Sequence, residues 1–270
     1  MKIGVFDSGF GGLTILEQIR RRLPQYDYIF LGDNARTPYG TRSFETVYAY
    51  TLQCVEKLFA LDCQIVILAC NTASAKALRS IQQNDLQRIA PGRRVLGVIR
   101  PTVEAVGQIT ATHVVGLVAT EGTVKSNSYP LEIAKLFPDI VVASEPCPMW
   151  VPLIENNEHL GDGADFFVRK YINELFAKDA RIDTLILGCT HYPLMIDKIA
   201  SYTPHGVRIV TQGSIVAESL ADYLRRHTEQ TEKCSQGGTV RYLTTESVEK
   251  FQTSASVFLK EAVAAEKIEL

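Results

Sequence analysis

Short apolar runs alternate with amphipathic segments along most of the chain. Three early runs, KIGVFD, YIFLGD and IVILAC, are continuous enough to be strands buried on both faces of a parallel sheet. Between and after them, apolar residues recur at helical spacing over residues 14–23, 43–59 and 72–81. Four later runs, RVLGVI, HVVGLVAT, IVVASEP and TLILGC, continue the alternation. This order predicts an α/β fold built from doubly wound parallel sheets. Residues 228–238 are predicted as a loop, and a strand, TVRYLTT, and a last helix follow it.

Two motifs recur in the same order, which indicates two similar domains. KIGVFDSG and VVGLVATEG share an apolar run around Gly4 and Gly116, and VILACNT and LILGCTH share a run that leads to Cys70 and Cys189. Chance similarity between buried strands is the alternative. We expect two α/β domains related by a pseudo-two-fold axis, with the active site in the cleft between them. Their expected spans are 1–98 plus 208–270 for the first domain and 99–207 for the second.

Composition excludes several classes of protein. The chain has 270 residues, of which 46% are hydrophobic and 21% charged, as in ordinary globular proteins, and its net charge is −2. A charge this close to zero gives no support for nucleic-acid binding. No run approaches the roughly 20 apolar residues that a membrane helix needs, and the N-terminal apolar run is too short for a signal peptide. We therefore expect a cytoplasmic protein without nucleic-acid or membrane partners.

The chain has 6 cysteines, and two of them stand out by their setting. Scattered spacing and the absence of a signal peptide argue against disulfides, and the absence of a CxxC pair argues against structural zinc, so no metal is expected. Most of the cysteines should be buried packing residues. Cys70 and Cys189 differ because each ends an apolar strand and is followed by polar residues, Asn71 and Thr72 in one case and Thr190 in the other.

Ligands of open parallel sheets bind beyond the carboxyl ends of the strands. The motifs DSGFGG, GDNARTPYG, ACNTAS, ATEGT and GCTHYP all lie at such ends. If the two domains face each other, these motifs line one cleft with a thiol on each wall. Short polar side chains beside the first N–H groups of a helix suit a small carboxylate. DSGFGG matches neither a dinucleotide fingerprint nor a phosphate loop, so a tight strand–helix turn is its simplest interpretation.

Other interpretations of the thiols remain open at this point. Cys189 and His191 could be metal ligands or a Cys–His nucleophile pair. A cysteine-dependent hydrolase or lyase would need only one of the two thiols. A binding protein that closes on an acidic amino acid would catalyse no reaction, and its affinity would depend on neither thiol.

Six motifs in order resemble one family. FDSGFGGLT, GDNARTPYG, ACNTAS, VGLVATEGT, CPMWVPLIE and LGCTHYPL are similar to segments of glutamate racemase, in the cofactor-independent amino-acid racemase family that also includes aspartate racemase. The resemblance runs from about residue 3 to about residue 225. It implies interconversion of L- and D-glutamate through two thiol bases on opposite walls of a cleft, with aspartate racemase or another cysteine-dependent enzyme of the superfamily as the alternative.

The resemblance also implies roles for particular residues. Cys70 acts on D-glutamate and Cys189 on L-glutamate, with Asp7 as the partner of the first thiol and His191 as the partner of the second. Asp33 and Glu155 are further candidates for assisting residues. The expected substrate-binding residues are Asp7, Ser8, Tyr39, Gly40, Asn71, Thr72, Thr120, Thr123, Thr190 and His191.

Further expectations follow from the same resemblance. The family uses no pyridoxal phosphate or other cofactor, commonly forms homodimers and supplies D-glutamate for peptidoglycan. Some relatives have an N-terminal extension linked to activation by a cell-wall precursor; this chain starts at its first strand, so no such activation is expected. Arg100 stands at a position where many relatives are expected to have an acidic, small or apolar residue. We interpret it as part of a surface or hinge ion pair unless it reaches the cleft.

Overall fold

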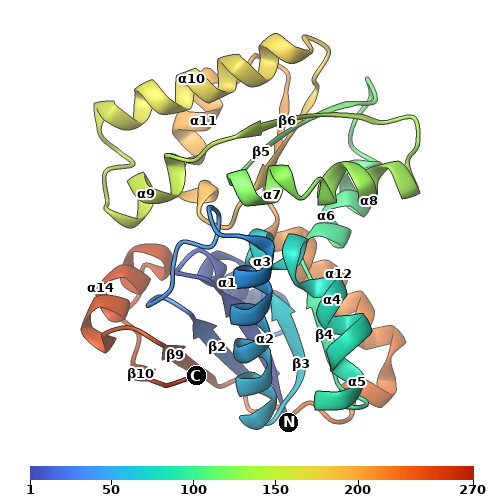
Figure 1. Ribbon diagram of the computed structural model, residues 1–270, viewed down its shortest axis with the longest axis vertical. Helices are drawn as coiled ribbons and strands as arrows, with labels where there is room; N and C mark the ends of the chain where they lie inside the picture. Colours follow the sequence, from blue (N-terminus) through green and yellow to red (C-terminus); the bar gives the residue numbers. More distant parts are fainter.

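The computed structural model describes residues 1–270 and contains two parallel sheets, one in each half of an elongated molecule (Figure 1). The strands are β1 (Lys2–Asp7), β2 (Tyr28–Gly32), β3 (Cys63–Leu68), β4 (Arg94–Gly97), β5 (Val114–Ala119), β6 (Val141–Pro146), β7 (Thr184–Gly188), β8 (Arg208–Val210), β9 (Val240–Thr244) and β10 (Ala265–Lys267). The first sheet has the order β10-β9-β2-β1-β3-β4, and the second has the order β6-β5-β7-β8.

At least one helix lies between each pair of consecutive strands, which confirms the expected α/β fold class. They are α1 (Gly12–Arg22), α2 (Phe44–Ala60), α3 (Asn71–Lys76), α4 (Leu78–Ser80), α5 (Leu86–Ile89), α6 (Ile99–Val106), α7 (Glu121–Lys125), α8 (Ser128–Leu136), α9 (Trp150–Glu155), α10 (Asp162–Lys178), α11 (Ile196–Tyr202), α12 (Gly213–Arg226), α13 (Thr228–Thr231) and α14 (Val248–Leu259). A π-helical turn, η1 (Ile81–Asp85), follows α4, and a 3-10 turn, η2 (Tyr192–Met195), precedes α11.

The two sheets repeat one strand order. Within the first sheet, β2-β1-β3-β4 runs second, first, third and fourth along the chain, and β6-β5-β7-β8 does the same in the second sheet. In this correspondence β1 matches β5 and β3 matches β7, the same strands whose sequences share motifs. Cys70 and Cys189 therefore follow equivalent strands of the two sheets.

The central strands of both sheets are buried on both faces, as their continuous apolar sequences predict. In the first sheet, Ile3 and Val5 point to a core that is covered by α1, α12 and α14, whereas Phe6 points to the opposite core beneath α2 and α3. In the second sheet, Val115 packs with α6 and α8, and Val118 packs on the side of α10 and α11. This two-sided burial fixes the strand register and hence the position of each strand end.

Three features differ from the sequence-based expectation. Residues 228–238 were expected to be a loop, but α13 forms over Thr228–Thr231 and buries Gln230, which is hydrogen-bonded to Gln64. The edge strands β8 and β10 were not expected, because each is only 3 residues long and one, Ala265–Lys267, is largely polar. The helix expected over 72–81 is divided into α3, α4 and the start of η1.

Strand β8 bears on the domain boundary. It pairs with β7 in the second sheet, where Thr184 aligns with Arg208 and Ile186 with Val210. We therefore propose that the second domain continues through Val210 instead of ending at residue 207, with the chain returning to the first domain at α12.

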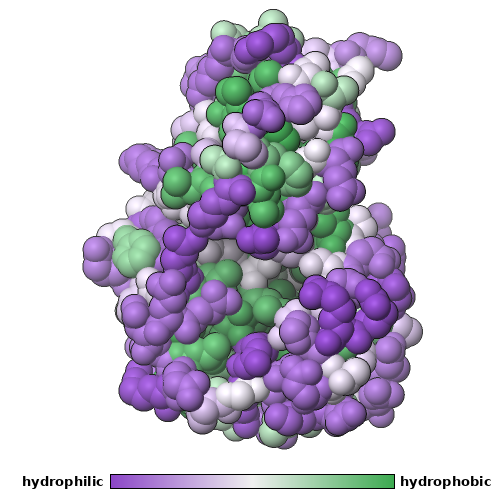
Figure 2. Space-filling model, turned by 90° about the vertical axis from the view of Figure 1, so that its right-hand side faces the viewer, coloured by the Kyte–Doolittle hydropathy of each residue, from purple (hydrophilic) through white to green (hydrophobic).

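A hollow lies between the two halves, near α4, α8 and α12, on the side of the molecule shown in Figure 2. Its volume is about 620 Å³, and apolar side chains such as Leu78, Leu96 and Leu220 contribute to its lining. Arg100 lies at this hollow and pairs with Glu104 at 2.7 Å and with Glu132 at 3.6 Å. The interpretation of Arg100 as a surface ion pair is confirmed, and its side chain does not line the cleft between the thiols.

We expect Leu68→Ala to lower the free energy of unfolding by about 2–5 kcal/mol, because it leaves a cavity in a fully buried strand two residues before Cys70. Urea denaturation followed by circular dichroism measures this change. The matched control is Leu160→Ala, where the leucine is 74% exposed, and we expect a change within about 0.5 kcal/mol. Equal effects at the two positions would contradict the described core.

Candidate active site

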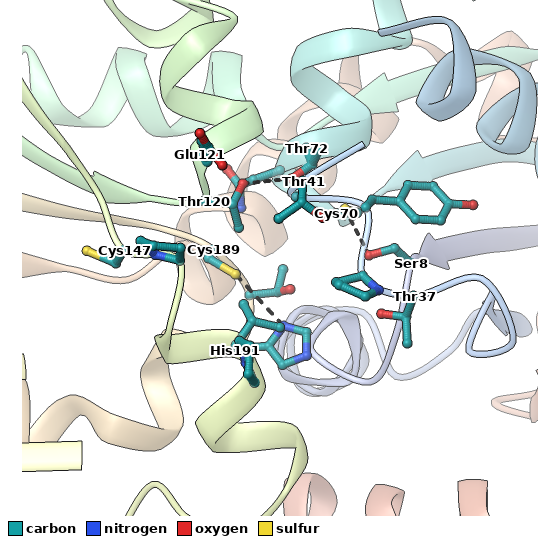
Figure 3. A pocket seen from close by; sticks show the side chains of 18 residues that line it. Ser8, Thr37, Thr41, Cys70, Thr72, Thr120, Glu121, Cys147, Cys189 and His191 are labelled. Carbon is teal, nitrogen blue, oxygen red and sulfur yellow. Dashed lines mark hydrogen bonds between the residues drawn. The ribbon is translucent and has the colours of Figure 1, made fainter. Parts of the chain in front are cut away.

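A cavity of about 70 Å³ lies where the carboxyl ends of the two sheets face each other (Figure 3). Segments from both halves of the molecule line it. Of the residues expected at the site, the cavity is lined by Ser8, Tyr39, Gly40, Cys70, Asn71, Thr72, Thr120, Cys189, Thr190 and His191. Asp7 and Thr123 are not in direct contact with the cavity, and each is hydrogen-bonded to residues that are.

One wall of the cavity carries Cys70, which occupies the N-cap position of α3, two residues after the end of β3. Its thiol is 6% exposed, and the Ser8 hydroxyl lies 3.3 Å from its Sγ. Burial, reinforced by the negative charge of Asp7, raises the pKa of Cys70 to about 12. At neutral pH this side of the cavity therefore holds a protonated thiol.

The opposite wall carries Cys189, whose Sγ lies 3.8 Å from Nδ1 of His191. The other ring nitrogen of His191, Nε2, lies 3.1 Å from Oε1 of Glu155. Burial by itself would lower the pKa of His191, but the interactions with Cys189 and Glu155 outweigh it and raise the pKa well above its ordinary value. An imidazolium beside a thiol favours the thiolate, so this wall is suited to hold a base.

Glu155 reaches His191 because α9 is fixed against the turn that carries the histidine. Trp150, at the start of α9, is fully buried and meets the ring of Tyr192 edge to face, with the ring centroids 4.7 Å apart. The glutamate also accepts a longer hydrogen bond, of 3.5 Å, from the Thr37 hydroxyl. Glu155 was only a candidate for assistance from the sequence; its contact makes it the charge partner of His191.

Asp7 lies between the two walls, at the end of β1. Its carboxylate accepts hydrogen bonds from the Gly9 N–H at 2.9 Å and from the Thr190 hydroxyl at 3.4 Å. Burial raises the pKa of Asp7, while the positive charge of His191 opposes that shift. Asp7 therefore acts on both thiol settings without being hydrogen-bonded to either thiol.

The glycines of DSGFGG serve close packing at this point. A methyl group added at Gly11 would clash with the Thr190 hydroxyl and the His191 ring. The first turn of α1 can therefore approach the histidine loop only with glycine there. This contact explains the motif without any nucleotide.

A cluster of hydroxyls joins the two halves beside the cavity. Thr72 Oγ1 lies 2.9 Å from Thr120 Oγ1 and 3.4 Å from Thr123 Oγ1, and Thr120 donates to Thr123 at 3.1 Å. Next to it, the N–H of Gly122 donates to the carbonyl of Gly40 at 2.7 Å. These groups come from α3, α7 and the loop before α2, so they bring polar groups of both halves together at one rim.

Asp33 lies outside the cavity, behind Tyr39. Its carboxylate accepts hydrogen bonds from the Tyr39 hydroxyl, from Arg36 at 2.6 Å and from Thr245 at 2.9 Å. A carboxylate occupied by three donors is suited to hold the Tyr39 loop in place and is poorly placed to move a proton within the cleft.

Several other residues that line the cavity are not distinguished by any sequence pattern. Thr37, Pro38, Thr41, Glu121, Cys147, Pro148, Val151 and Pro152 complete its lining. Most of them lie in motifs that were recognised, GDNARTPYG and CPMWVPLIE, but the sequence does not distinguish lining residues from their neighbours. Cys147 is fully buried, its sulfur lies 3.7 Å from the Glu145 carbonyl, and in Figure 3 it is directed away from Cys189.

The arrangement favours proton transfer at a carbon atom held between the walls. One wall offers a protonated thiol, and the other offers a thiol beside a cationic imidazole. Both thiols are almost completely buried, so bulk water has little access to either of them. No group of three or more potential metal ligands occurs in the structure.

Comparisons with known proteins agree on one family. The family model of Asp/Glu/hydantoin racemases matches residues 13–220. The glutamate racemase of Ruegeria sp. (strain TM1040) is 37% identical over 277 residues, covering 98% of this chain and 99% of its own. The crystal structure of glutamate racemase isoform RacE1 from Bacillus anthracis matches with a TM-score of 0.90 and 32% identity, over 100% of this chain and 97% of its own. A Francisella tularensis glutamate racemase in complex with D-glutamate matches with a TM-score of 0.87 and 34% identity, over 99% and 97% of the two chains.

We expect Glu155→Gln to lower the pKa of His191, because the neutral amide removes the charge that favours the imidazolium. A pH titration of the imidazole by NMR, from about pH 5 to pH 10, measures the shift. The matched control is Glu158→Gln, which removes a nearby exposed carboxylate and should leave the His191 titration unchanged. An unchanged titration in Glu155→Gln would contradict the assigned charge pair.

The same shift predicts how stability depends on pH. A histidine with a raised folded-state pKa contributes its full stabilisation below the unfolded-state value of about 6.5 and loses it as pH rises through the folded-state value. The free energy of unfolding of the wild type should therefore decline between about pH 6.5 and the folded-state pKa of His191 more steeply than that of Glu155→Gln. Urea denaturation at a series of pH values measures both slopes, and parallel slopes would count against the raised pKa of His191.

Proposed function

This chain belongs to the Asp/Glu/hydantoin racemase family, and we propose that it is a glutamate racemase that interconverts L- and D-glutamate by two-base proton transfer. The observation that carries this proposal is the pair of buried thiols, Cys70 and Cys189, on opposite walls of one cavity. A racemase needs a base on one face of the α-carbon and an acid on the other.

In the proposed direction from L-glutamate, the Cys189 thiolate takes the α-proton and forms an S–H bond. The electron pair of the broken C–H bond remains on the α-carbon, and the Cys70 thiol delivers its proton to the opposite face. The products are D-glutamate, a Cys189 thiol and a Cys70 thiolate, and the reverse reaction exchanges these roles. We propose His191 and Asp7 as the groups that control protonation of Cys189 and Cys70 respectively.

The carbanion-like transition state needs stabilisation that the cavity can supply. The α-proton of an amino acid is a very weak acid, and the proposed mechanism uses no cofactor as an electron sink. The N-terminus of α3, together with the side chains of Asn71, Thr72 and Thr190, places hydrogen-bond donors beside the thiols. Donors fixed around a carboxylate in a site that excludes water are worth more than the same donors in bulk solvent.

We propose the following residues as substrate contacts of this site, carried over from the family motifs. They are Asp7, Ser8, Tyr39, Gly40, Asn71, Thr72, Thr120, Thr123, Thr190 and His191. Asp7 and Thr123 would act from behind the cavity lining, through Thr190 and through the threonine cluster.

We propose glutamate in preference to aspartate because the relatives with high coverage are glutamate racemases. One methylene group in a pocket is worth only about 1–3 kcal/mol, so some activity on aspartate is compatible with this assignment. We further propose that the product serves peptidoglycan synthesis in the cytoplasm and that the enzyme is a homodimer. No helix in the structure is long and apolar enough to cross a bilayer.

We expect Cys70→Ser and Cys189→Ser each to lower the racemisation rate by about 10²–10⁴-fold, because each removes one of the two proton-transfer groups. L- and D-glutamate have equal free energies, so kcat/KM must fall equally in the two directions in either variant. The measurement is the change in optical rotation with each enantiomer, in chelator-treated protein without added cofactor.

Solvent exchange in heavy water separates the roles of the two thiols. Cys70→Ser retains the base for L-glutamate and should exchange that enantiomer's α-proton slowly without inversion, and Cys189→Ser should do the same for D-glutamate. The control is Cys234→Ser, far from the cavity, which should racemise like the wild type. Wild-type rates in either active-site variant would exclude the two-thiol mechanism, and folded wild type that racemises only aspartate would move the chain to that branch.

A further inference from the structure

A chain of buried hydrogen bonds leads away from the cavity at Asn71. The Asn71 side chain lines the cavity and is 2% exposed. Behind it lie Gln212, just before α12, then Tyr129 in α8 and Thr102 in α6. These three residues are buried, and none of them lines the cavity.

The donor and acceptor roles in this series of hydrogen bonds are set at its far end by a backbone carbonyl. The Thr102 hydroxyl donates its one hydrogen to the carbonyl of Val98 at 2.7 Å. Its oxygen can then only accept, and Nε2 of Gln212 lies 3.0 Å from it. The NH₂ end of the Gln212 amide must therefore be the end that faces Thr102.

The Tyr129 hydroxyl is oriented by its two amide neighbours. Nε2 of Gln212 also lies 2.8 Å from the Tyr129 hydroxyl, which accepts from it. The hydrogen of that hydroxyl goes to Oδ1 of Asn71 at 2.7 Å. Burial raises the pKa of Tyr129, so its phenol keeps this hydrogen at neutral pH.

The orientation of Asn71 follows from these contacts. Its Oδ1 accepts from Tyr129, and also lies 3.2 Å from Nε2 of Gln212, while its Nδ2 donates to Oε1 of Gln212 at 2.5 Å. An amide nitrogen carries two hydrogens, and Gln212 takes one of them. The second has no acceptor in the protein, and it belongs to a side chain that lines the cavity.

We infer that Thr102, Tyr129 and Gln212 are positioning residues. They fix the amide of Asn71 so that one N–H remains for an anionic oxygen of the bound amino acid. Without them the two ends of that amide could exchange, and a carbonyl oxygen would then meet the substrate carboxylate. This inference rests on the proposed function for the identity of the ligand, and on the hydrogen-bond geometry for the orientation.

The chain of contacts also crosses between the two halves of the molecule. Asn71 follows β3 of the first sheet, whereas Tyr129 packs in the core beneath the second sheet. The amide is therefore held in this orientation only while the two halves are in contact. A purely structural network would stabilise that contact without affecting how tightly a ligand is held.

Thr102 offers the sharpest test because it lies two residues away from the cavity in the hydrogen-bond chain. Thr102→Val keeps the shape and removes the acceptor that orients Gln212, and Thr102→Ser keeps the acceptor. The dissociation constant of D-glutamate by calorimetry, and KM and kcat in both directions, are measured for each variant together with its melting temperature.

We expect Thr102→Val to raise the dissociation constant by about tenfold and to lower kcat/KM in both directions by at least the same factor, because the oriented amide binds the carboxylate in the ground state and stabilises the negative charge that develops in the transition state. Thr102→Ser should stay within about twofold of the wild type. Tyr129→Phe, which removes the donor to Asn71, should resemble Thr102→Val and serves if that variant fails to fold. In an Asn71→Ala background, Thr102→Val should have no further effect on binding.

The possible results distinguish failure of the positioning role from failure of the proposed function. Unchanged binding and kcat/KM in Thr102→Val and Tyr129→Phe, with only a lowered melting temperature, would overturn the inference and leave glutamate racemisation standing. Additive effects of Thr102→Val and Asn71→Ala would also overturn it. A wild type that binds D-glutamate with the expected dependence on Thr102 but does not racemise it would overturn the proposed function alone. A wild type that neither binds nor racemises glutamate would overturn both.

Discussion

The pairing of β3 and β7 inside their sheets is the constraint on which the site depends. Each strand is central in its sheet: β3 lies between β1 and β4, and β7 lies between β5 and β8. Hydrogen bonds on both sides leave little freedom for the residue that follows. Cys189 directly follows β7 and Cys70 lies two residues after β3, so the separation of the two thiols is determined by two rigid sheets and by how their halves meet. Loops alone would not hold two reactive groups on opposite faces of a small molecule.

Equivalent positions in the fold do not give the thiols equivalent surroundings. Both are almost completely buried, yet Cys70 lies beside a hydroxyl and near a carboxylate, and Cys189 lies beside an imidazole that is itself paired with a carboxylate. Asp7 contributes to both settings, because its charge opposes ionisation of Cys70 and favours a cation at His191. The result is a cavity with a protonated thiol on one wall and a thiol beside a cationic imidazole on the other. Such an asymmetry in a nearly symmetric fold is what a one-proton exchange between two faces requires.

Much of the fold and of the site could be predicted from the sequence, and the features that could not be predicted depend on contacts between distant segments. Apolar runs predicted seven of the strands, and TVRYLTT was predicted as an eighth. The short edge strands β8 and β10 bury too little to leave such a run. The recurrence around Cys70 and Cys189 predicted that the two thiols follow equivalent strands. The contact between Glu155 and His191 could not be read from spacing, because it depends on how Trp150 packs against Tyr192.

The thiols and the proposed substrate donor differ in what fixes them, and this difference links motion to chemistry. Each thiol is fixed within one half of the molecule by its own strand. The amide of Asn71 is oriented by Gln212, at the start of α12, and by Tyr129 of the second half, which reaches it only when the halves are in contact. Opening the cleft would therefore separate the thiols and release the amide in one step, whereas closure would restore both. A site built in this way has its donor oriented only when water is excluded, which is also when a fixed donor stabilises a developing negative charge most strongly.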